Sequence, residues 1–262
     1  MNIFKLLFLY LLISISIFAQ DCVGDIKTWH SNFSTLEATE KLEQNFNLGF
    51  SNTTGNTKHL DVNAKYDFSL CTVSYDKKLI KIIFDTSLFF TQTNSEKSNE
   101  EYLLNLGIEQ ELDKEWLTYF ALNWLRNPEF KNYNHKTSVG VGIGKNLFFD
   151  GTQSLTLKIG TSLTQEDYAN TQKSENFSSL NEYIEYKNQL NKISRFYFKT
   201  GAIQHLQGFK DDYEVLAILG VKFNVGEKIN LILEQEVAYD NLPPIGFKKT
   251  DTKSIVRLGY KF

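Results

Sequence analysis

The chain has 262 residues, of which 42% are hydrophobic and 14% aromatic, and its formal net charge is −3. A mildly acidic chain offers no electrostatic footprint for a nucleic acid. The length is enough for one large domain or two small ones, and Pro, Met and Cys are scarce, with 3, 1 and 2 residues. Composition therefore argues against a nucleic-acid partner and leaves the fold class open.

Residues 1–20 have the pattern of a cleaved signal peptide. Lys5 supplies a positive start, residues 6–18 form a largely apolar run, and Ala19-Gln20 precede the charged Asp21. An apolar run of about 13 residues is shorter than the ~20 that a membrane-spanning helix needs, which disfavours the alternative of a retained anchor. The sequence thus predicts export, with residues 21–43 as a periplasmic N-terminal segment.

Apolar and polar residues alternate with a period of two from Gln44 onward. In the last such segment, Val256, Leu258 and Tyr260 share one face, and Arg257 and Lys261 share the other. One face suits hydrocarbon and the other suits water, as in a lipid-facing barrel. The pattern predicts twelve strands, near 44–52, 59–71, 79–93, 101–113, 116–126, 136–149, 153–166, 180–192, 194–207, 213–225, 228–241 and 252–262.

The connections between these segments alternate in predicted length. Short turns are expected at 113–115, 150–152, 191–193 and 226–228, and longer polar loops at 94–100, 127–135, 167–179 and 242–251. Short periplasmic turns and longer outer loops are typical of outer-membrane barrels. An even strand count also places the first and the last residue of the barrel on the periplasmic side of the membrane.

Aromatic residues favour a membrane barrel over a soluble secreted β protein. Trp116 and Trp124 fall on one face of a strand, roughly 20 Å apart along the membrane normal, and could mark the two aromatic girdles. The alternative is that both pack in a soluble core. Phe262 at the chain end, two residues after Tyr260, resembles the C-terminal assembly signal of Gram-negative outer-membrane barrels. We therefore predict an all-β, antiparallel transmembrane β-barrel over residues 44–262 that contacts outer-membrane lipid and the assembly machinery.

Four stretches also resemble the salt-induced outer membrane protein family, known as domain of unknown function 481. They are 48–57 (Leu-Gly-Phe-Ser-Asn-Thr-Thr-Gly-Asn-Thr), Gly140-Val141-Gly142-Ile143-Gly144, Glu166-Asp167-Tyr168, and the end from Tyr239 through Pro243-Pro244 to Phe262. The resemblance covers roughly residues 44–262. It implies an outer-membrane location and a link to salt or osmotic conditions, and it carries over no catalytic residue.

The sequence gives no pattern for a catalytic or metal site. His30, His59, His135 and His205 lack metal-ligand spacing and are expected at surface or loop positions. The pair Asp211-Asp212 is expected in a solvated loop. Outer-membrane phospholipase has a serine two residues after its histidine, and none of the four histidines here has a serine at that position. We predict no enzyme, cofactor or metal; the alternative is a barrel enzyme acting on lipid or peptide.

Charged residues gather on the predicted lumenal face. Glu234 and Glu236 share this face with Lys222 and Arg257, and strand counting puts Glu236 nearly opposite Arg257. Either these charges interlock and fill the barrel, or they line a narrow pathway for small solutes or ions. Further lumenal charges are expected at Asp61, Lys65, Asp67, Glu109, Glu111 and Lys158.

The two cysteines are both predicted to be periplasmic. Cys22 lies at the mature N-terminus and Cys71 at the end of the second strand. Disulfides persist in the periplasm, so we predict a Cys22–Cys71 bridge. The alternative is two unpaired thiols.

Overall fold

The computed structural model describes residues 42–54, 59–73, 78–93, 96–113, 115–129, 131–149, 152–170, 173–209, 211–244 and 246–261. The predicted signal peptide (1–20) and nearly all of the predicted periplasmic segment (21–43) lie outside these ranges, and both stay predictions. The described residues contain no helix that is long and apolar enough to cross a bilayer.

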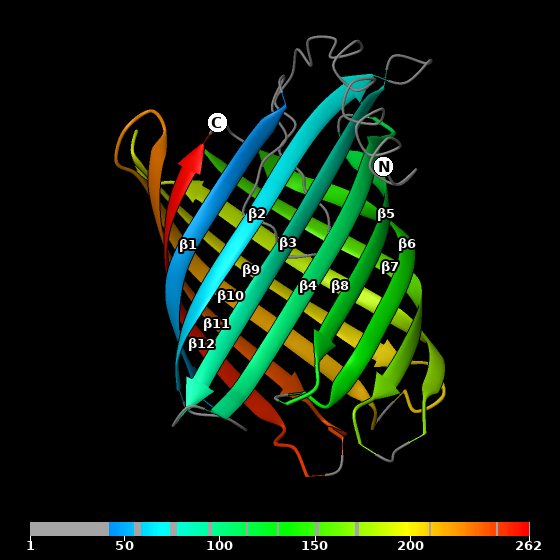
Figure 1. Cartoon of the computed structure of the whole chain (residues 1–262). Coiled ribbons are helices and arrows are strands. Elements are labelled where there is room, and N and C mark those ends of the chain that lie inside the picture. The colour runs from blue at the N-terminus through cyan, green and yellow to red at the C-terminus, as the bar shows by residue number, and fades with distance from the viewer. Residues whose placement is uncertain are drawn as a thin grey trace, which may run out of the picture.

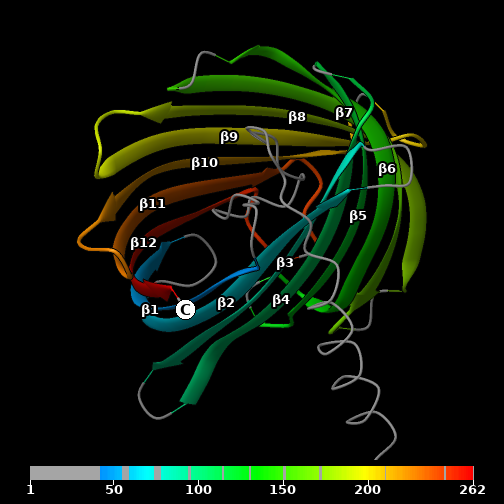
Figure 2. The same cartoon turned by 90° about the horizontal axis from the view of Figure 1, so that it is seen from above.

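Twelve antiparallel strands close into one barrel, in which each strand pairs with the next and β12 returns to β1 (Figures 1 and 2). The closing pair joins Phe46 to Tyr260 and Leu48 to Leu258. The predicted fold class and strand number are both confirmed. The strands are β1 (Glu43–Thr54), β2 (His59–Val73), β3 (Leu79–Thr93), β4 (Glu96–Glu111), β5 (Trp116–Asn127), β6 (Tyr133–Phe149), β7 (Gln153–Tyr168), β8 (Glu175–Gln189), β9 (Ser194–His205), β10 (Tyr213–Asn224), β11 (Ile229–Asp240) and β12 (Thr250–Lys261).

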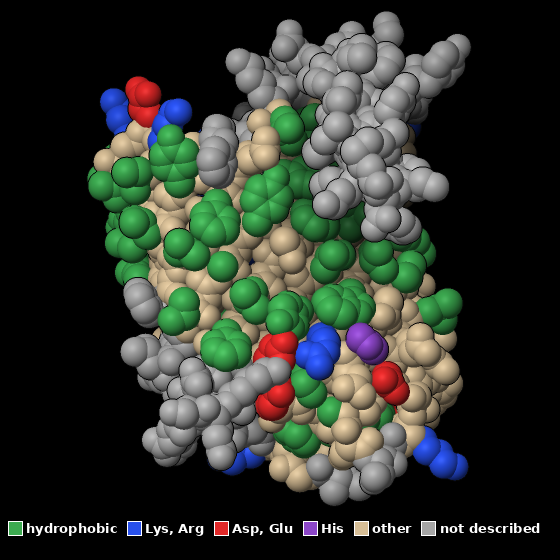
Figure 3. Space-filling model, viewed as in Figure 1, with side chains coloured by type: hydrophobic (Ala, Val, Ile, Leu, Met, Phe, Trp, Pro, Cys, Tyr) green, Lys and Arg blue, Asp and Glu red, His purple; other side chains and the backbone are tan. Residues whose placement is uncertain are grey.

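The two faces of the wall differ as the alternation predicted. On β12, Leu258 and Val256 point outward with 59% and 47% of their surface exposed, whereas Arg257 points inward and is buried. On the face that Figure 3 shows, hydrophobic side chains cover the middle of the wall, and charged side chains gather toward its ends. A soluble protein buries its apolar side chains, so this inverted arrangement is that of a barrel surrounded by lipid.

The two strand-end tryptophans lie where the alternation placed them. Trp116 and Trp124 stand at opposite ends of β5 on its outward face, with Trp116 40% exposed. The Lys145 Nζ lies 5.1 Å from the centre of the Trp116 ring. Aromatic and basic side chains at the edges of an apolar band are typical of membrane interfaces.

The outer connections are shorter than the sequence indicated. The loop predicted at 94–100 is wrong, because β3 continues to Thr93 and β4 begins at Glu96, with Thr93 opposite Glu96. Polar residues extend these strands because the ladder is built from backbone groups, whatever the side chain. The other three loops are likewise reduced, to 128–132, 169–174 and 241–249.

A small apolar cluster is buried against the inner face of β5. Leu117, Tyr119 and Ala121 on β5 form a buried cluster with the half-buried Tyr183 of β8. The Tyr119 ring lies over Gly142 of β6 and Gly160 of β7: a Cβ on Gly142 would stand 2.5 Å from the ring, and one on Gly160 would stand 2.3 Å from the hydroxyl. Gly142 of the 140–144 motif and Gly160 therefore make room for a large inward side chain.

Candidate functional site: the barrel lumen

A cavity of about 300 Å³ occupies the outer part of the lumen. It extends from the loop between β11 and β12, at Pro244 and Phe247, down to Glu234 and Arg257. Its wall mixes apolar side chains with charges of both signs, including Phe89, Leu103, Ile203, Ile218, Glu101, Lys136, Glu214, Glu236, Asp240 and Lys253. A concave site of this mixed character suits a small polar or amphipathic molecule.

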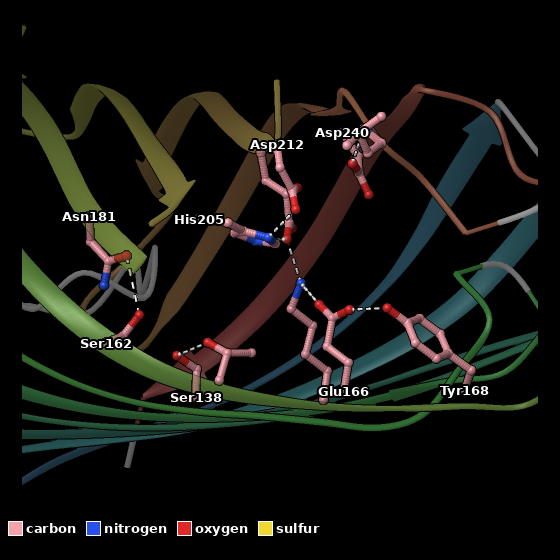
Figure 4. A network of polar contacts seen from close by, with 12 residues as sticks. Ser138, Ser162, Glu166, Tyr168, Asn181, His205, Asp212 and Asp240 are labelled. Carbon is pink, nitrogen blue, oxygen red and sulfur yellow. Dashed lines mark hydrogen bonds and ion pairs between the residues drawn. The ribbon is translucent and has the colours of Figure 1, made fainter. Parts of the chain in front are cut away.

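Lys136 links β6 and β7 to β10 at the mouth of the cavity, where Figure 4 shows Glu166 and Tyr168 facing His205 and Asp212. It extends from β6, and its Nζ lies 2.6 Å from a carboxylate oxygen of Glu166 on β7 and 2.6 Å from one of Glu214 on β10. The Tyr168 hydroxyl donates to the second oxygen of Glu166. A lysine between two carboxylates satisfies charges that would otherwise be costly to bury.

His205 joins the same network from the end of β9. Its Nδ1 lies 2.7 Å from Asp212 Oδ2, its Nε2 lies 3.7 Å from Glu214 Oε1, and its ring stacks on Phe177 with centroids 3.7 Å apart. The expected surface or loop position is therefore wrong for His205, which is buried and faces the lumen. Asp212, expected to be merely solvated, is its partner. Both residues lie next to a strand end, at positions whose side chains point into the lumen.

The other histidines differ. His135 is exposed on the outward face of β6, and its ring centre lies 5.8 Å from that of Trp124. The His59 side chain and His30 lie outside what the structure describes. Among the described residues, no group of His, Cys, Asp and Glu has the arrangement of a metal site.

The Lys253 side chain spans the cavity from β12 to β4. It belongs to β12, yet its Nζ lies 2.7 Å from Glu101 Oε1 on β4 and 4.5 Å from the centre of the Phe89 ring. Asn127 donates to the second Glu101 oxygen at 2.7 Å. Lys253 and Lys136 thus each form an ion pair between strands that are not neighbours, near the mouth of the cavity.

Arg257 and Glu234 form the floor of the cavity. The guanidinium pairs with the Glu234 carboxylate and donates from Nε to Asn63 Oδ1 at 3.2 Å, and the Tyr197 hydroxyl donates to Glu234 at 2.8 Å. Further buried pairs in the lumen include Lys65 with Asp85, 3.7 Å apart, and Lys158 with Glu109. Opposite charges at contact distance compensate the desolvation of each other.

The predicted lumenal cluster is only partly brought together. Glu234 meets Arg257, but the expected position of Glu236 opposite Arg257 is wrong, because Glu236 stands opposite Lys253 and Arg257 stands opposite Ile232. β11 ends and β12 begins earlier than the polar loop suggested, which shifts the register by four residues. Lys222 also faces inward, opposite Ile232 on the neighbouring strand, but is not part of the cavity wall.

The sequence patterns did not identify five residues of this site: Lys136, Glu166, Glu214, Lys253 and Glu101. Each of them alternates in phase with the inward residues of its strand, so the pattern predicted that it is buried. The pattern did not predict which residues pair, because Lys136 on β6 and Glu214 on β10 are separated by four strands along the wall.

The periplasmic end of the wall contains two further predicted features. Cys71 is fully buried and disulfide-bonded, and Cys22 lies outside the described residues, so the predicted pairing stays a prediction. Tyr260 is 43% exposed on the outward face of β12, with the Lys228 Nζ 5.8 Å from its ring centre. Phe262 lies outside the described residues.

Solved structures that share this fold include three with a TM-score above 0.5. They are the NanC porin (TM-score 0.54, 7% identity, 83% of this chain and 100% of that chain), an outer membrane channel from Pseudomonas putida F1 (0.53, 9%, 90% and 100%) and the Salmonella typhi outer membrane phospholipase with bound calcium (0.53, 10%, 89% and 94%). At such low identity the likeness shows the fold alone. No curated protein matches the sequence.

The closed barrel, its apolar outer surface and its fold identify an outer-membrane β-barrel protein. The family model described as "Protein of unknown function, DUF481" matches residues 46–262, nearly the whole barrel. The chain belongs to the DUF481 family.

Proposed function

We propose that this barrel is a narrow pore for small solutes, with the outer cavity as its vestibule and the layer of ion pairs below as its constriction. The cavity carries the proposal, because it opens at the outer loops and reaches the Arg257–Glu234 pair inside the wall. A barrel interlocked for structural reasons alone has no need of such a volume. Twelve strands also lie between small filled barrels and wide porins.

Polar groups beyond the floor support a continuous pathway. Asn47 Oδ1, Asn63 Nδ2 and Asn230 Oδ1 are buried in the lumen without a hydrogen-bond partner among the described residues. Asn47 and Asn230 flank Gly259 on the neighbouring strands, on the periplasmic side of Arg257. Buried polar groups need partners, and water would supply them. This polar lining favours a hydrated constriction over a sealed apolar plug.

Conductance across planar lipid bilayers tests the pore. Glu234→Ala combined with Arg257→Ala removes both charged side chains of the floor, and we expect a larger single-channel conductance than in the wild type. A matched control replaces Glu227 and Lys228, which form an exposed periplasmic turn, and should leave the conductance unchanged. Absence of current from both the wild type and the floor variant would refute the pore.

We further propose that the barrel catalyses no reaction. The nearest likeness to a catalytic arrangement is His205 with Asp212, and there the free Nε2 faces the Glu214 carboxylate rather than a hydroxyl. A base aimed at a carboxylate has no nucleophile to activate. Hydrolysis of phospholipid or peptide by the purified barrel, lost in His205→Ala, would contradict this proposal.

The C-terminal strand is proposed as the contact with the assembly machinery, with Tyr260 and Phe262 as its recognition residues. The outward exposure of Tyr260 supports this role. Tyr260→Ala is expected to lower the amount of barrel in the outer membrane, measured by the mobility difference between boiled and unboiled samples. A role in salt or osmotic response rests on the family resemblance and is tested by growth of a deletion strain at raised osmolarity.

A further inference from the structure

The charges of the cavity wall divide into those that are compensated and those that are not. The four inward cations Lys65, Lys136, Lys253 and Arg257 each lie beside a carboxylate of Asp85, Glu214, Glu101 or Glu234. Glu166, which also contacts Lys136, does not line the cavity. A close pair of opposite charges has a weak field a few ångströms away, so these groups contribute little to the potential felt by a passing ion.

Glu236 is different. It lies half-buried on the inward face of β11, it lines the cavity, and no ion pair or side-chain hydrogen bond reaches its carboxylate from the part of the chain that the structure describes. The backbone register places Lys253 directly opposite it on β12. Lys253 nevertheless extends to Glu101 on the far side of the cavity, at 2.7 Å, and so leaves its neighbour uncompensated.

The other charges that line the cavity lie nearer to its mouth; they are Lys131, Asp240, Lys248, Lys249 and Asp251. Asp240 is four residues further along β11, roughly 13 Å nearer to the outer loops, and accepts a hydrogen bond from the backbone of Leu242. Lys248 and Lys249 are exposed at the rim, and Lys131 lies in the β5–β6 loop. Salt screens exposed charges within about 10 Å at 0.1 M, whereas charges recessed in a protein wall are screened less.

We propose that Glu236 makes the pathway selective for cations, with its carboxylate kept free because Lys253 is held by Glu101. This inference rests on the proposed pore. A negative wall group inside a narrow passage raises the local concentration of cations and lowers that of anions. The solutes admitted most readily are then small cations, inorganic or amine-bearing.

Reversal potentials in a KCl gradient test the assignment. The wild type is expected to favour K⁺ over Cl⁻, Glu236→Gln to bring the permeability ratio toward one, and Glu236→Lys to invert it. Glu227→Gln, which removes one exposed carboxylate from a periplasmic turn, is the matched control and should keep the wild-type ratio.

A second variant tests the role of Lys253 without altering Glu236. Glu101→Gln removes the carboxylate that holds Lys253, so the ammonium should turn to Glu236 and lower the preference for K⁺. The same substitution should have no further effect on selectivity when Glu236 is already glutamine. The boiled-against-unboiled gel shift verifies that every variant is folded.

The possible results separate the two proposals. Channels with the same permeability ratio in the wild type and Glu236→Gln would overturn the selectivity assignment and leave the pore intact. An additive effect of Glu101→Gln and Glu236→Gln would overturn the link through Lys253. A wild type without channels would overturn the pore and the selectivity together.

Discussion

Two inward tyrosines, Tyr119 on β5 and Tyr197 on β9, lie over glycines of other strands, and their hydroxyls have different surroundings. Tyr119 covers Gly142 and Gly160 within an apolar cluster, and its hydroxyl has no hydrogen-bond partner among the described residues. Tyr197 covers Gly220, and its hydroxyl donates to Glu234, the partner of Arg257. The same packing of a ring on glycine fills space at Tyr119 and positions a hydrogen-bond donor for a charged pair at Tyr197.

The difference shows that the same packing serves two purposes within one wall. Ring-on-glycine packing needs only volume, so the wall beneath Tyr119 is closed. A charge pair needs donors, acceptors and water, so the wall around Arg257 keeps a polar surface next to the cavity.

The largest expected effect comes from removing one member of the Arg257–Glu234 ion pair. Arg257→Met leaves Glu234 buried without its cation, and we expect a loss of about 3–5 kcal/mol in the free energy of unfolding. Urea unfolding in lipid vesicles, followed by tryptophan fluorescence, measures it. Adding Glu234→Leu should restore most of the loss, because an apolar pair has no charge to desolvate. A double variant as unstable as the single one would contradict this explanation.

Removing the two hydroxyls compares the tyrosines directly. Tyr197→Phe deletes a hydrogen bond to a charged group and is expected to cost about 1.5–3 kcal/mol. Tyr119→Phe deletes a hydroxyl without a protein partner and should be neutral or slightly stabilising. The two variants remove the same atom, so each is the control of the other in the same unfolding experiment. Equal losses would mean that the two sites do not differ as described.

Overfilling the packing around Tyr119 should cost less than breaking the ion pair. Gly142→Val places a Cβ 2.4 Å from the Ile159 carbonyl oxygen and 2.5 Å from the Tyr119 ring, for a loss of about 1–3 kcal/mol. The temperature at which the unboiled band disappears on a gel measures it. Partial recovery in combination with Tyr119→Leu would show that the ring is the obstacle; no recovery would assign the strain to the backbone.

The smallest effect is expected outside the membrane-spanning strands, in the turn between β4 and β5. Asp113 Oδ1 accepts from the backbone N–H groups of Trp116 and Glu115 at 2.7 and 2.8 Å, which lowers the pKa of Asp113 below its usual range. A lowered folded-state pKa stabilises the fold above the unfolded value of about 3.9, and the gain is lost as the pH falls through the folded value. Asp113→Asn should therefore lower the unfolding midpoint slightly at pH 7 and not at all in strong acid. A difference that persists in acid would exclude the charge as its cause.

The sequence also left some partners undetermined. The parity of β12 placed Arg257 and Lys253 inward, yet the register of β11 against β12 was predicted four residues away from the one observed, so Glu236 was paired with the wrong cation. The polar segment 242–251 contains no residue that fixes where a ladder of backbone hydrogen bonds stops. His205 was missed for a related reason, since a strand end next to a polar loop resembles the loop itself.

The sequence by itself determined that the chain forms twelve membrane-crossing strands and which face of each meets lipid. Side chains alternate with a period of two along a strand, so a hydrophobic pattern specifies the inside and the outside. Only the tertiary structure decided which inward residues meet, such as Lys136 with Glu214 or Lys253 with Glu101. Those contacts cross the lumen between strands that are not neighbours, and their geometry follows from the closure and tilt of the whole barrel.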